Sequence, residues 1–314
     1  MRLSKFNTVV TLLSVVTMFD LIGAAQPATA VGLVGLTEDN TLILFDSASP
    51  SSTTSVRVSG PDLTGTLLGI DYRPADGQLY GIGSSNNIFN INPDTGAATR
   101  VNTLATPFTA GGFSGVDFNP AADALRLTGT NDQNLRIPMG GTGATLVDGN
   151  LNYAAGTANA GISPTITASA YTNSFPGPSA AVSPRTTQLY DIDSNLDILA
   201  LQNPPNDGTL QTVGSLGVNF GPIGGFDIFS PSAGDNTAYA AFGSPSGNLA
   251  ASLYTINLTT GAASSMGQIG SGYNLIGLAA EPVPEPSAVV GTLALGALGT
   301  FSLLKRKQKQ NIKA

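Results

Sequence analysis

Three aspartates recur at one position of a repeated motif. Asp71, Asp117 and Asp227 each stand two residues after a glycine, in the segments Gly-Ile-Asp-Tyr, Gly-Val-Asp-Phe and Gly-Phe-Asp-Ile. If each segment forms the same strand of a repeated unit, the three carboxylates converge. Carboxylate oxygens are ligands that Ca²⁺ prefers, so one interpretation is a calcium site. The favoured interpretation is structural, with each aspartate bonding backbone N–H groups of its own unit, because the other two units offer Tyr171 or a neighbour and Ala279, which would leave a ring of ligands incomplete.

A second acidic segment begins at Asp191 and resembles the start of an EF-hand calcium loop. Its sequence is Asp-Ile-Asp-Ser-Asn-Leu-Asp. An EF-hand loop has glycine at its sixth position and a bidentate glutamate at its twelfth. Here those positions are Leu196 and Gln202. The segment is therefore interpreted as a polar hairpin rather than as a calcium loop.

The residue types that are absent exclude several classes of enzyme. The chain has no Cys, no His and no Trp. Thiolate zinc sites, disulfides, Ser-His-Asp triads and His-ligated metals are therefore excluded. Glycoside hydrolysis needs two carboxyl groups, and Asp pairs alone could supply them. A hydrolase or lyase that uses such pairs stays open as the alternative function. Tyr153 and Tyr273, if exposed, are candidates for stacking on sugars, although tyrosine more often packs in an interface core.

The aspartate motif belongs to a longer repeat. The repeat combines a glycine-led apolar segment, a Leu-Tyr segment, an alternating segment and a turn that contains Thr-Gly. Alternation with period two predicts strands, and Asn, Pro and Gly predict the turns between them. Four complete units begin near residues 67, 113, 167 and 223, and each is predicted to contain four strands. Units of roughly 40–50 residues with four strands are typical of propeller blades.

A fifth unit is split between the two ends of this region. Residues 274–279 resemble only the first strand of a unit, whereas residues 34–58 resemble the other three. A split unit is what a closed ring requires, because the first and last segments then share one sheet. The predicted fold is an all-β, five-bladed β-propeller over residues 31–281, and a β-sandwich or an open β-solenoid is the rival.

The first thirty residues are predicted to be a signal peptide. Arg2 and Lys5 form a short cationic start, residues 8–19 are largely apolar, and Ala28 and Ala30 give the small-x-small pattern of a cleavage site. Export of the domain follows from this interpretation.

The last residues, 282–314, have three parts. Pro284, Glu285 and Pro286 precede an uncharged, mostly apolar run over residues 287–304, and residues 305–314 begin with Lys-Arg-Lys-Gln-Lys. Eighteen residues of helix rise about 27 Å, which is just enough to span a bilayer core. The basic end is expected to stay cytoplasmic. This order resembles the PEP-CTERM sorting signal of exported bacterial proteins, and the resemblance implies processing by an exosortase-type membrane enzyme near the Pro-Glu-Pro motif. An ordinary membrane anchor is the alternative.

The region between the two ends is strongly acidic. Between Val31 and Pro284 it has six arginines, no lysine and eighteen acidic residues, for a net charge of −12. Such a domain repels nucleic acid and anionic lipid headgroups, so neither is an expected partner.

The repeated units also resemble a bacterial propeller-like family of unknown function, domain of unknown function 4394. The resemblance rests on the Gly-x-Asp-aromatic-x-Pro and Leu-Tyr segments and on residues 199–210, and it covers nearly all of residues 31–281. It implies the fold and supplies no activity. Together these features predict an exported cell-surface or extracellular module that binds or has a structural role without catalysis, with no obligatory cofactor. Its predicted ligand is an extracellular polysaccharide or another surface protein.

Overall fold

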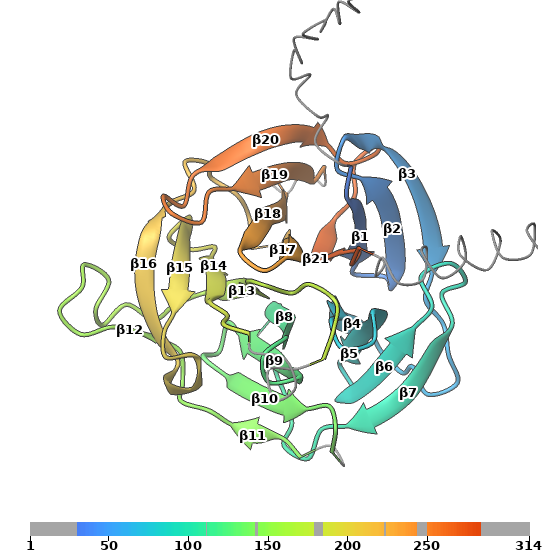
Figure 1. Cartoon of the computed structure of the whole chain (residues 1–314), viewed down its shortest axis with the longest axis horizontal. Helices are drawn as coiled ribbons and strands as arrows, with labels where there is room; N and C mark the ends of the chain where they lie inside the picture. Colours follow the sequence, from blue (N-terminus) through green and yellow to red (C-terminus); the bar gives the residue numbers. More distant parts are fainter. Residues whose placement is uncertain are drawn as a thin grey trace, which may run out of the picture.

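The structure is a computed structural model that describes residues 30–110, 112–141, 144–178, 185–222, 224–243 and 250–283. Within these residues the chain forms five mainly antiparallel sheets arranged as blades around a central axis (Figure 1). The all-β, five-bladed propeller is therefore confirmed. The predicted cleavage residue Ala28, the Pro284-Glu285-Pro286 motif and the predicted membrane span over residues 287–304 lie outside the described residues. No helix within the described ranges is long and apolar enough to cross a membrane.

Each blade is a sheet whose first strand lies nearest the axis. Blade 1 contains β4 (Leu67–Arg73), β5 (Gln78–Gly83), β6 (Asn87–Ile91) and β7 (Ala98–Thr103). Blade 2 contains β8 (Ser114–Asn119), β9 (Ala124–Gly129), β10 (Asn134–Pro138) and β11 (Leu146–Val147). Blade 3 contains β13 (Ile166–Tyr171), β14 (Leu189–Asp193), β15 (Ile198–Gln202) and β16 (Thr209–Ser215), with a 3₁₀ helix, η1 (Pro205–Asp207). Blade 4 contains β17 (Gly224–Ser232), β18 (Asp235–Phe242), β19 (Ser252–Ile256) and β20 (Ala263–Gln268).

Blade 5 closes the ring from both ends of the domain. Its inner strand β21 (Leu275–Ala280) pairs antiparallel with β1 (Gly32–Thr37), which continues to β2 (Thr41–Asp46) and β3 (Ser49–Arg57). Leu33 lies opposite Ala280, and the Glu281 N–H donates to the Gly32 carbonyl at 2.8 Å. The predicted split unit is confirmed. The described chain therefore starts and ends on one face of the propeller, here called the exit face because the inner strands end there; the opposite face is the entry face.

The repeated turns form because asparagine side chains accept hydrogen bonds from the backbone that follows them. Asn92 Oδ1 accepts from the N–H groups two and three residues later, and Asn257 Oδ1 does the same in blade 4. Gly96 and Gly261 follow with φ of 71° and 82°, a conformation that glycine adopts without strain. This chemistry makes tight hairpins, and it explains why the Asn-to-Gly spacing recurs in the sequence.

Apolar packing holds four of the five junctions between blades. The junctions 1/2, 3/4, 4/5 and 5/1 each bury a cluster of twelve or thirteen hydrophobic residues. The junction between blades 2 and 3 has only a six-residue cluster around Leu151 and Tyr153, beside buried polar groups. Each fully buried aliphatic or aromatic side chain contributes about 1.5–3 kcal/mol, so hydrophobic burial dominates the cohesion of four junctions and is weaker at the fifth.

The glycine of each Gly-x-Asp motif allows neighbouring inner strands to approach closely. A Cβ atom added to Gly69 of β4 would overlap the Val116 side chain of β8, and one added to Gly225 of β17 would overlap the backbone at Leu278 of β21. Glycine therefore stands at these positions because a side chain would separate the blades near the axis.

Blade 3 differs from the predicted four-stranded unit. A further strand, β12 (Asn152–Tyr153), pairs in parallel with β16 at the outer edge of this blade, and it comes from the connection that follows the two-residue strand β11 of blade 2. The predicted hairpin over residues 191–197 is confirmed: β14 ends at Asp193, and β15 begins at Ile198.

Candidate functional site

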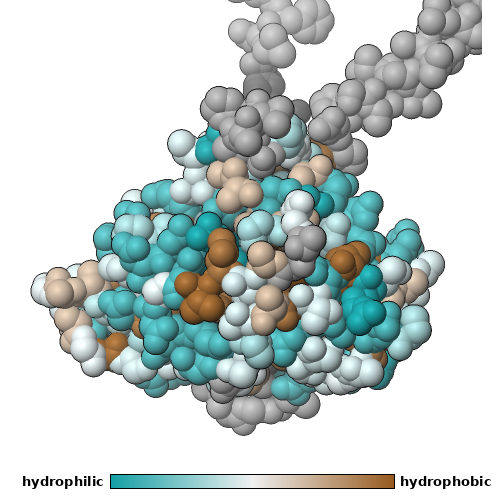
Figure 2. Space-filling view, turned by 90° about the horizontal axis from the view of Figure 1, so that it is seen from below, coloured by the Kyte–Doolittle hydropathy of each residue, from teal (hydrophilic) through white to brown (hydrophobic). Residues whose placement is uncertain are grey.

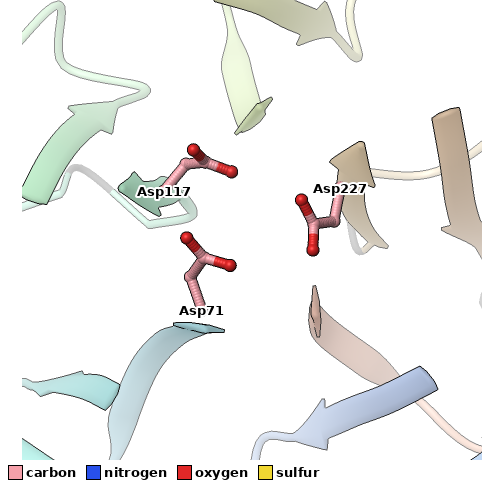
Figure 3. Close-up of side chains that lie close together, drawn as sticks. All are labelled: Asp71, Asp117 and Asp227. Carbon is pink, nitrogen blue, oxygen red and sulfur yellow. The ribbon is translucent and has the colours of Figure 1, made fainter. Parts of the chain in front are cut away.

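The three repeated aspartates converge at the centre of the propeller. Asp71, Asp117 and Asp227 extend from the inner strands β4, β8 and β17 toward one another (Figure 3). One carboxylate oxygen from each lies within 4.8 Å of the other two, and the residues are only 5%, 1% and 5% exposed. The convergence predicted from the repeat is therefore present in the structure.

Each aspartate accepts a backbone hydrogen bond from the neighbouring blade. Asp71 Oδ2 accepts from the Phe118 N–H at 2.7 Å, Asp117 Oδ1 from the Tyr171 N–H at 3.2 Å, and Asp227 Oδ2 from the Ala280 N–H at 2.6 Å. The expected bond within the same unit is present for Asp227, whose Oδ1 accepts from the Ile228 N–H, but the donors from the next blade were not predicted. The inner strands lie so close together that the next blade supplies the donor, and the Gly-x-Asp motif is a device that joins consecutive blades.

The two remaining blades have alanine at the aspartate position. In blade 2 the aspartate, Asp117, directly precedes the donor residue, Phe118. By the same rule the aspartate position is Ala170 in blade 3, before the donor Tyr171, and Ala279 in blade 5, before the donor Ala280. The position that the sequence assigned to Tyr171 or a neighbour is therefore Ala170. Because Ala170 offers no acceptor to blade 4, the Ile228 N–H there is satisfied instead by Asp227 Oδ1 at 2.6 Å. The carboxylates occupy three of five positions, as expected from the sequence.

Burial and mutual repulsion favour the protonated forms of these groups. Burial, followed by the nearby Asp227 charge, raises the pKa of Asp71 well above its usual value. Burial also raises the pKa of Asp117 well above its usual value, with further contributions from the charges of Asp71 and Asp227. The pKa of Asp227 rises to about 6, because burial outweighs the lowering effect of the Ala280 and Ile228 N–H groups. Close carboxylates without a counter-charge share protons, so the cluster carries less than three negative charges at neutral pH.

The channel around the cluster is narrow. A cavity of about 10 Å³ is lined by Asp71 and Asp227 on the exit side, and another of about 10 Å³ lies on the entry side, lined by Gly69 and Gly225 among others. A volume of 10–15 Å³ holds about one water molecule. A sugar ring does not fit, so the cluster can hold protons, a water or a single ion.

Two substitutions of Asp117 separate its role as an acceptor from its charge. Asp117→Ala is expected to lower the free energy of unfolding at pH 5 by about 1–3 kcal/mol, because the buried Tyr171 N–H loses its partner. Asp117→Asn keeps an acceptor oxygen and removes the repulsion, so we expect a smaller loss at pH 5 and a gain at pH 8. Guanidinium unfolding at both pH values measures this. Equal effects of the two substitutions would contradict the blade-joining role.

Calcium is expected to have little effect on this cluster. Each aspartate already uses one oxygen for an amide donor, whereas Ca²⁺ takes 6–8 oxygen ligands. We therefore expect the Tm at pH 7 to differ by less than about 1 °C between calcium chloride and a chelator, since only a ligand that binds the folded form raises it. A calcium-dependent rise that Asp117→Asn abolishes would assign a cation to the channel.

A buried arginine, which the sequence analysis missed, joins blades 2 and 3. Arg126 of β9 is 1% exposed. Its guanidinium donates to Tyr171 Oη at 3.2 Å, Asn134 Oδ1 at 2.6 Å, Asp148 Oδ2 at 2.7 Å and Asn206 Oδ1 at 2.8 Å. A signal for it exists: Arg126 lies opposite Asp117 in the sheet, at the repeat position that is tyrosine in the pairs Asp71–Tyr80 and Asp227–Tyr239. One charged exception among repeated tyrosines indicates a special partner across the junction.

Asp191 is buried in the same junction. Its Oδ1 accepts from Ser169 Oγ at 2.5 Å, and Ser169 Oγ also lies 2.7 Å from Thr128 Oγ1 of blade 2. Asp191 Oδ2 has no hydrogen-bond partner among the described residues. Burial raises the pKa of Asp191 to about 7, against a lowering effect of the Ser169 hydrogen bond and the Arg126 charge. Asp191 therefore lies buried between blades 2 and 3, where Ser169 is its hydrogen-bond partner.

The other candidates from this part of the sequence also have structural partners. Asp193 Oδ1 accepts from the N–H groups of Asn195 and Leu196, and its Oδ2 accepts from Tyr153 Oη at 2.6 Å. Of the two interpretations of Tyr153, the interface core is confirmed and sugar stacking is not, because Tyr153 is 4% exposed and packs in the junction of blades 2 and 3. Tyr273 is half-buried, with its hydroxyl 3.3 Å from Thr53 Oγ1.

These features define the class of protein: a five-bladed propeller whose buried aspartates join consecutive blades at the axis. The family described as Domain of unknown function (DUF4394) matches residues 41–279, which is most of the propeller. The chain belongs to this family. No curated protein matches this chain.

Solved structures with similar arrangements come from several bacteria. A protein of unknown function from Bacteroides thetaiotaomicron VPI-5482 is 15% identical, with a TM-score of 0.46 over 79% of this chain and 64% of that one. An auxiliary nutrient binding protein from Bacteroides ovatus ATCC 8483 is 12% identical, with a TM-score of 0.39 over 68% of this chain and 56% of that one. A protein from Lactobacillus plantarum is 16% identical, with a TM-score of 0.39 over 79% of this chain and 71% of that one. At these TM-scores the similarities carry no argument about function.

Proposed function

We propose that this protein is an exported, cell-surface or extracellular propeller that binds a ligand or has a structural role without catalysis. The observation that carries the proposal is the use of the repeated carboxylates: Asp71, Asp117 and Asp227 each hold a backbone N–H of the next blade inside a channel too narrow for a sugar. Acids engaged in this way stabilise a rigid ring. Such a ring is suited to present loops and shallow pockets on its two faces.

The alternative, a carbohydrate-active hydrolase or lyase, would need two carboxyl groups on either side of a glycosidic bond. The clustered aspartates have raised pKa values, which suits a general acid. However, the cavity beside them holds about one water, so a glycan has no access to them. This limited access favours binding over hydrolysis.

The purified full chain distinguishes the two functions. We expect it to bind at least one extracellular polysaccharide or surface protein and to release no new reducing ends from any glycan that it binds. Glycan arrays, capture assays with surface proteins and a reducing-end assay measure this. Release of reducing ends that Asp117→Asn abolishes would overturn the proposal in favour of the hydrolase.

Export and processing are the second part of the proposal. The signal-like start and the Pro284-Glu285-Pro286 motif with its apolar and basic tail support delivery across the membrane and recognition by an exosortase-type enzyme. Cell fractionation of the producing bacterium, followed by mass spectrometry of the exported protein, tests this. We expect a mature chain that begins near Ala30 and ends near Pro284. An intact chain confined to the cytosol would contradict export.

A further inference from the structure

The two faces of the propeller differ in how freely a ligand can reach them. On the exit face, a pocket of about 360 Å³ is lined by Pro74, Gly77, Pro176 and, at the end of the described chain, Pro282 and Val283. The last described residues of the chain therefore form part of the wall of this pocket. The entry face lies at the opposite end of the channel, away from both described ends, and it is the face that a tether at the C-terminus would turn outward.

The entry face has a pocket of about 270 Å³ beside the channel mouth. It lies where blade 5 meets blade 1 and the loop before blade 2. Its lining is Glu38, Thr66, Leu67, Leu68, Gly112, Phe113 and Ile276. Ligand pockets begin at about 300 Å³, so this one suits a group of about the size of a single ring.

The lining combines an aromatic ring, aliphatic side chains and a carboxylate. Phe113, Leu68 and Ile276 are half-buried, so their apolar surfaces remain partly open. Glu38 is exposed and accepts from Asn274 Nδ2 at 3.4 Å. A cation is attracted both to a carboxylate and to the face of an aromatic ring. The domain's net charge of −12 between Val31 and Pro284 favours the approach of a cationic ligand.

The side of the rim seen in Figure 2 differs from the entry-face pocket. This side is largely hydrophilic, and its apolar residues form separate patches. The exposed large hydrophobic residues among the described ones are few: Val101, Leu146, Val147, Ile162, Met266 and Val283. Small separate apolar patches are ordinary on soluble surfaces and do not mark a binding site.

We propose that the pocket formed by Glu38, Phe113, Leu68 and Ile276 on the entry face binds a cationic amino-sugar residue of an extracellular glycan. The inference rests on the proposed binding function and names its site and its ligand class. The sugar's apolar face packs on Phe113 and the aliphatic side chains, its ammonium group pairs with Glu38, and the Thr66 hydroxyl is available to a sugar hydroxyl. A neutral sugar would lack the ion pair with Glu38.

The test uses the full chain and three hexasaccharides of the same β-1,4 linkage, made of glucosamine, N-acetylglucosamine or glucose. Titration calorimetry at pH 6 is expected to show at least tenfold tighter binding of the glucosamine hexamer than of either neutral hexamer. Glu38→Gln and Phe113→Ala are each expected to weaken that binding about tenfold or more. Asp235→Asn, an exposed change of equal charge at the start of β18, is the matched control and is expected to leave binding within twofold.

Each of the other possible results would contradict the proposed pocket, the proposed ligand class or both. Equal losses in Glu38→Gln and Asp235→Asn would show general attraction to an acidic surface and would overturn the pocket. Binding of a neutral hexamer that Glu38→Gln leaves unchanged would overturn the ligand class and the site, while the proposed binding function would stand. Tighter binding of polylysine, lost in Glu38→Gln, would assign the pocket to a basic protein segment instead. Binding of none of the hexamers would overturn the inference, and the array and capture assays above would then decide the broader function.

Discussion

Replacing Arg126 with alanine is expected to lower the free energy of unfolding by about 3–5 kcal/mol, the cost of breaking a buried ion pair by removing one partner. The guanidinium is 1% exposed and pairs with Asp148, whose side chain is 7% exposed. Its other donors reach Tyr171 and Asn206 of blade 3. Because this junction has the smallest apolar cluster of the five, no large hydrophobic surface compensates for the loss.

Arg136 provides a matched control for this substitution. It pairs with the same Asp148 at 3.1 Å, but its side chain is 27% exposed and its bonds stay within blade 2. Arg136→Ala is expected to cost about 1 kcal/mol or less, as more exposed ion pairs do. Guanidinium unfolding of both variants gives the comparison. If Arg136→Ala costs as much as Arg126→Ala, the junction between blades 2 and 3 does not depend on the buried arginine.

The second large effect is a loss of stability as the pH rises from about 4 to about 7. Burial raises the pKa of Asp191 from 3.8 to about 7. The folded protein therefore binds more protons than the unfolded chain in this window, so the free energy of unfolding falls with increasing pH. A shift of about three units corresponds to roughly 4 kcal/mol at most. The raised pKa values of Asp71, Asp117 and Asp227 act in the same direction.

Asp191→Asn isolates the contribution of this one group. The amide mimics the protonated acid, so we expect a flatter dependence on pH, with stability above that of the unmodified chain at pH 8 and at or below it at pH 5. Nearby charges on Arg126 and Asp193 remain in the variant. Denaturant midpoints between pH 4.5 and 8 measure the slope. Asp235→Asn, an exposed change, should keep the original slope, and an unchanged slope in Asp191→Asn would refute the assignment.

Much of the fold could be predicted because the information is local and repeated. Alternating apolar residues and Asn-to-Gly turns specify hairpins within about fifty residues, and the split unit indicates closure by β1 and β21. The exposure that sugar stacking by Tyr153 requires is absent for a physical reason. A sheet in a propeller is covered on both faces, so alternation does not separate buried from exposed positions, and an aromatic residue near a turn is covered by the next blade.

The sequence likewise predicted one part of the candidate site and not the other. The repeat predicted that Asp71, Asp117 and Asp227 converge, but it did not predict that their donors Phe118, Tyr171 and Ala280 belong to the next blade. Those partners lie 47, 54 and 53 residues further along the chain. Their contact depends on how tightly the inner strands approach.

The sequence by itself determined the number of blades, the closure of the ring and the position of one acidic residue in three inner strands. These follow from how often the repeat recurs, from the unit split between the two ends and from the motif inside the repeat. Only the tertiary structure decided which N–H each carboxylate holds, that Arg126 and Asp191 are buried together, and that Glu38 and Phe113 line one pocket. These contacts join different blades, and their distances depend on packing between surfaces that no single repeat encodes.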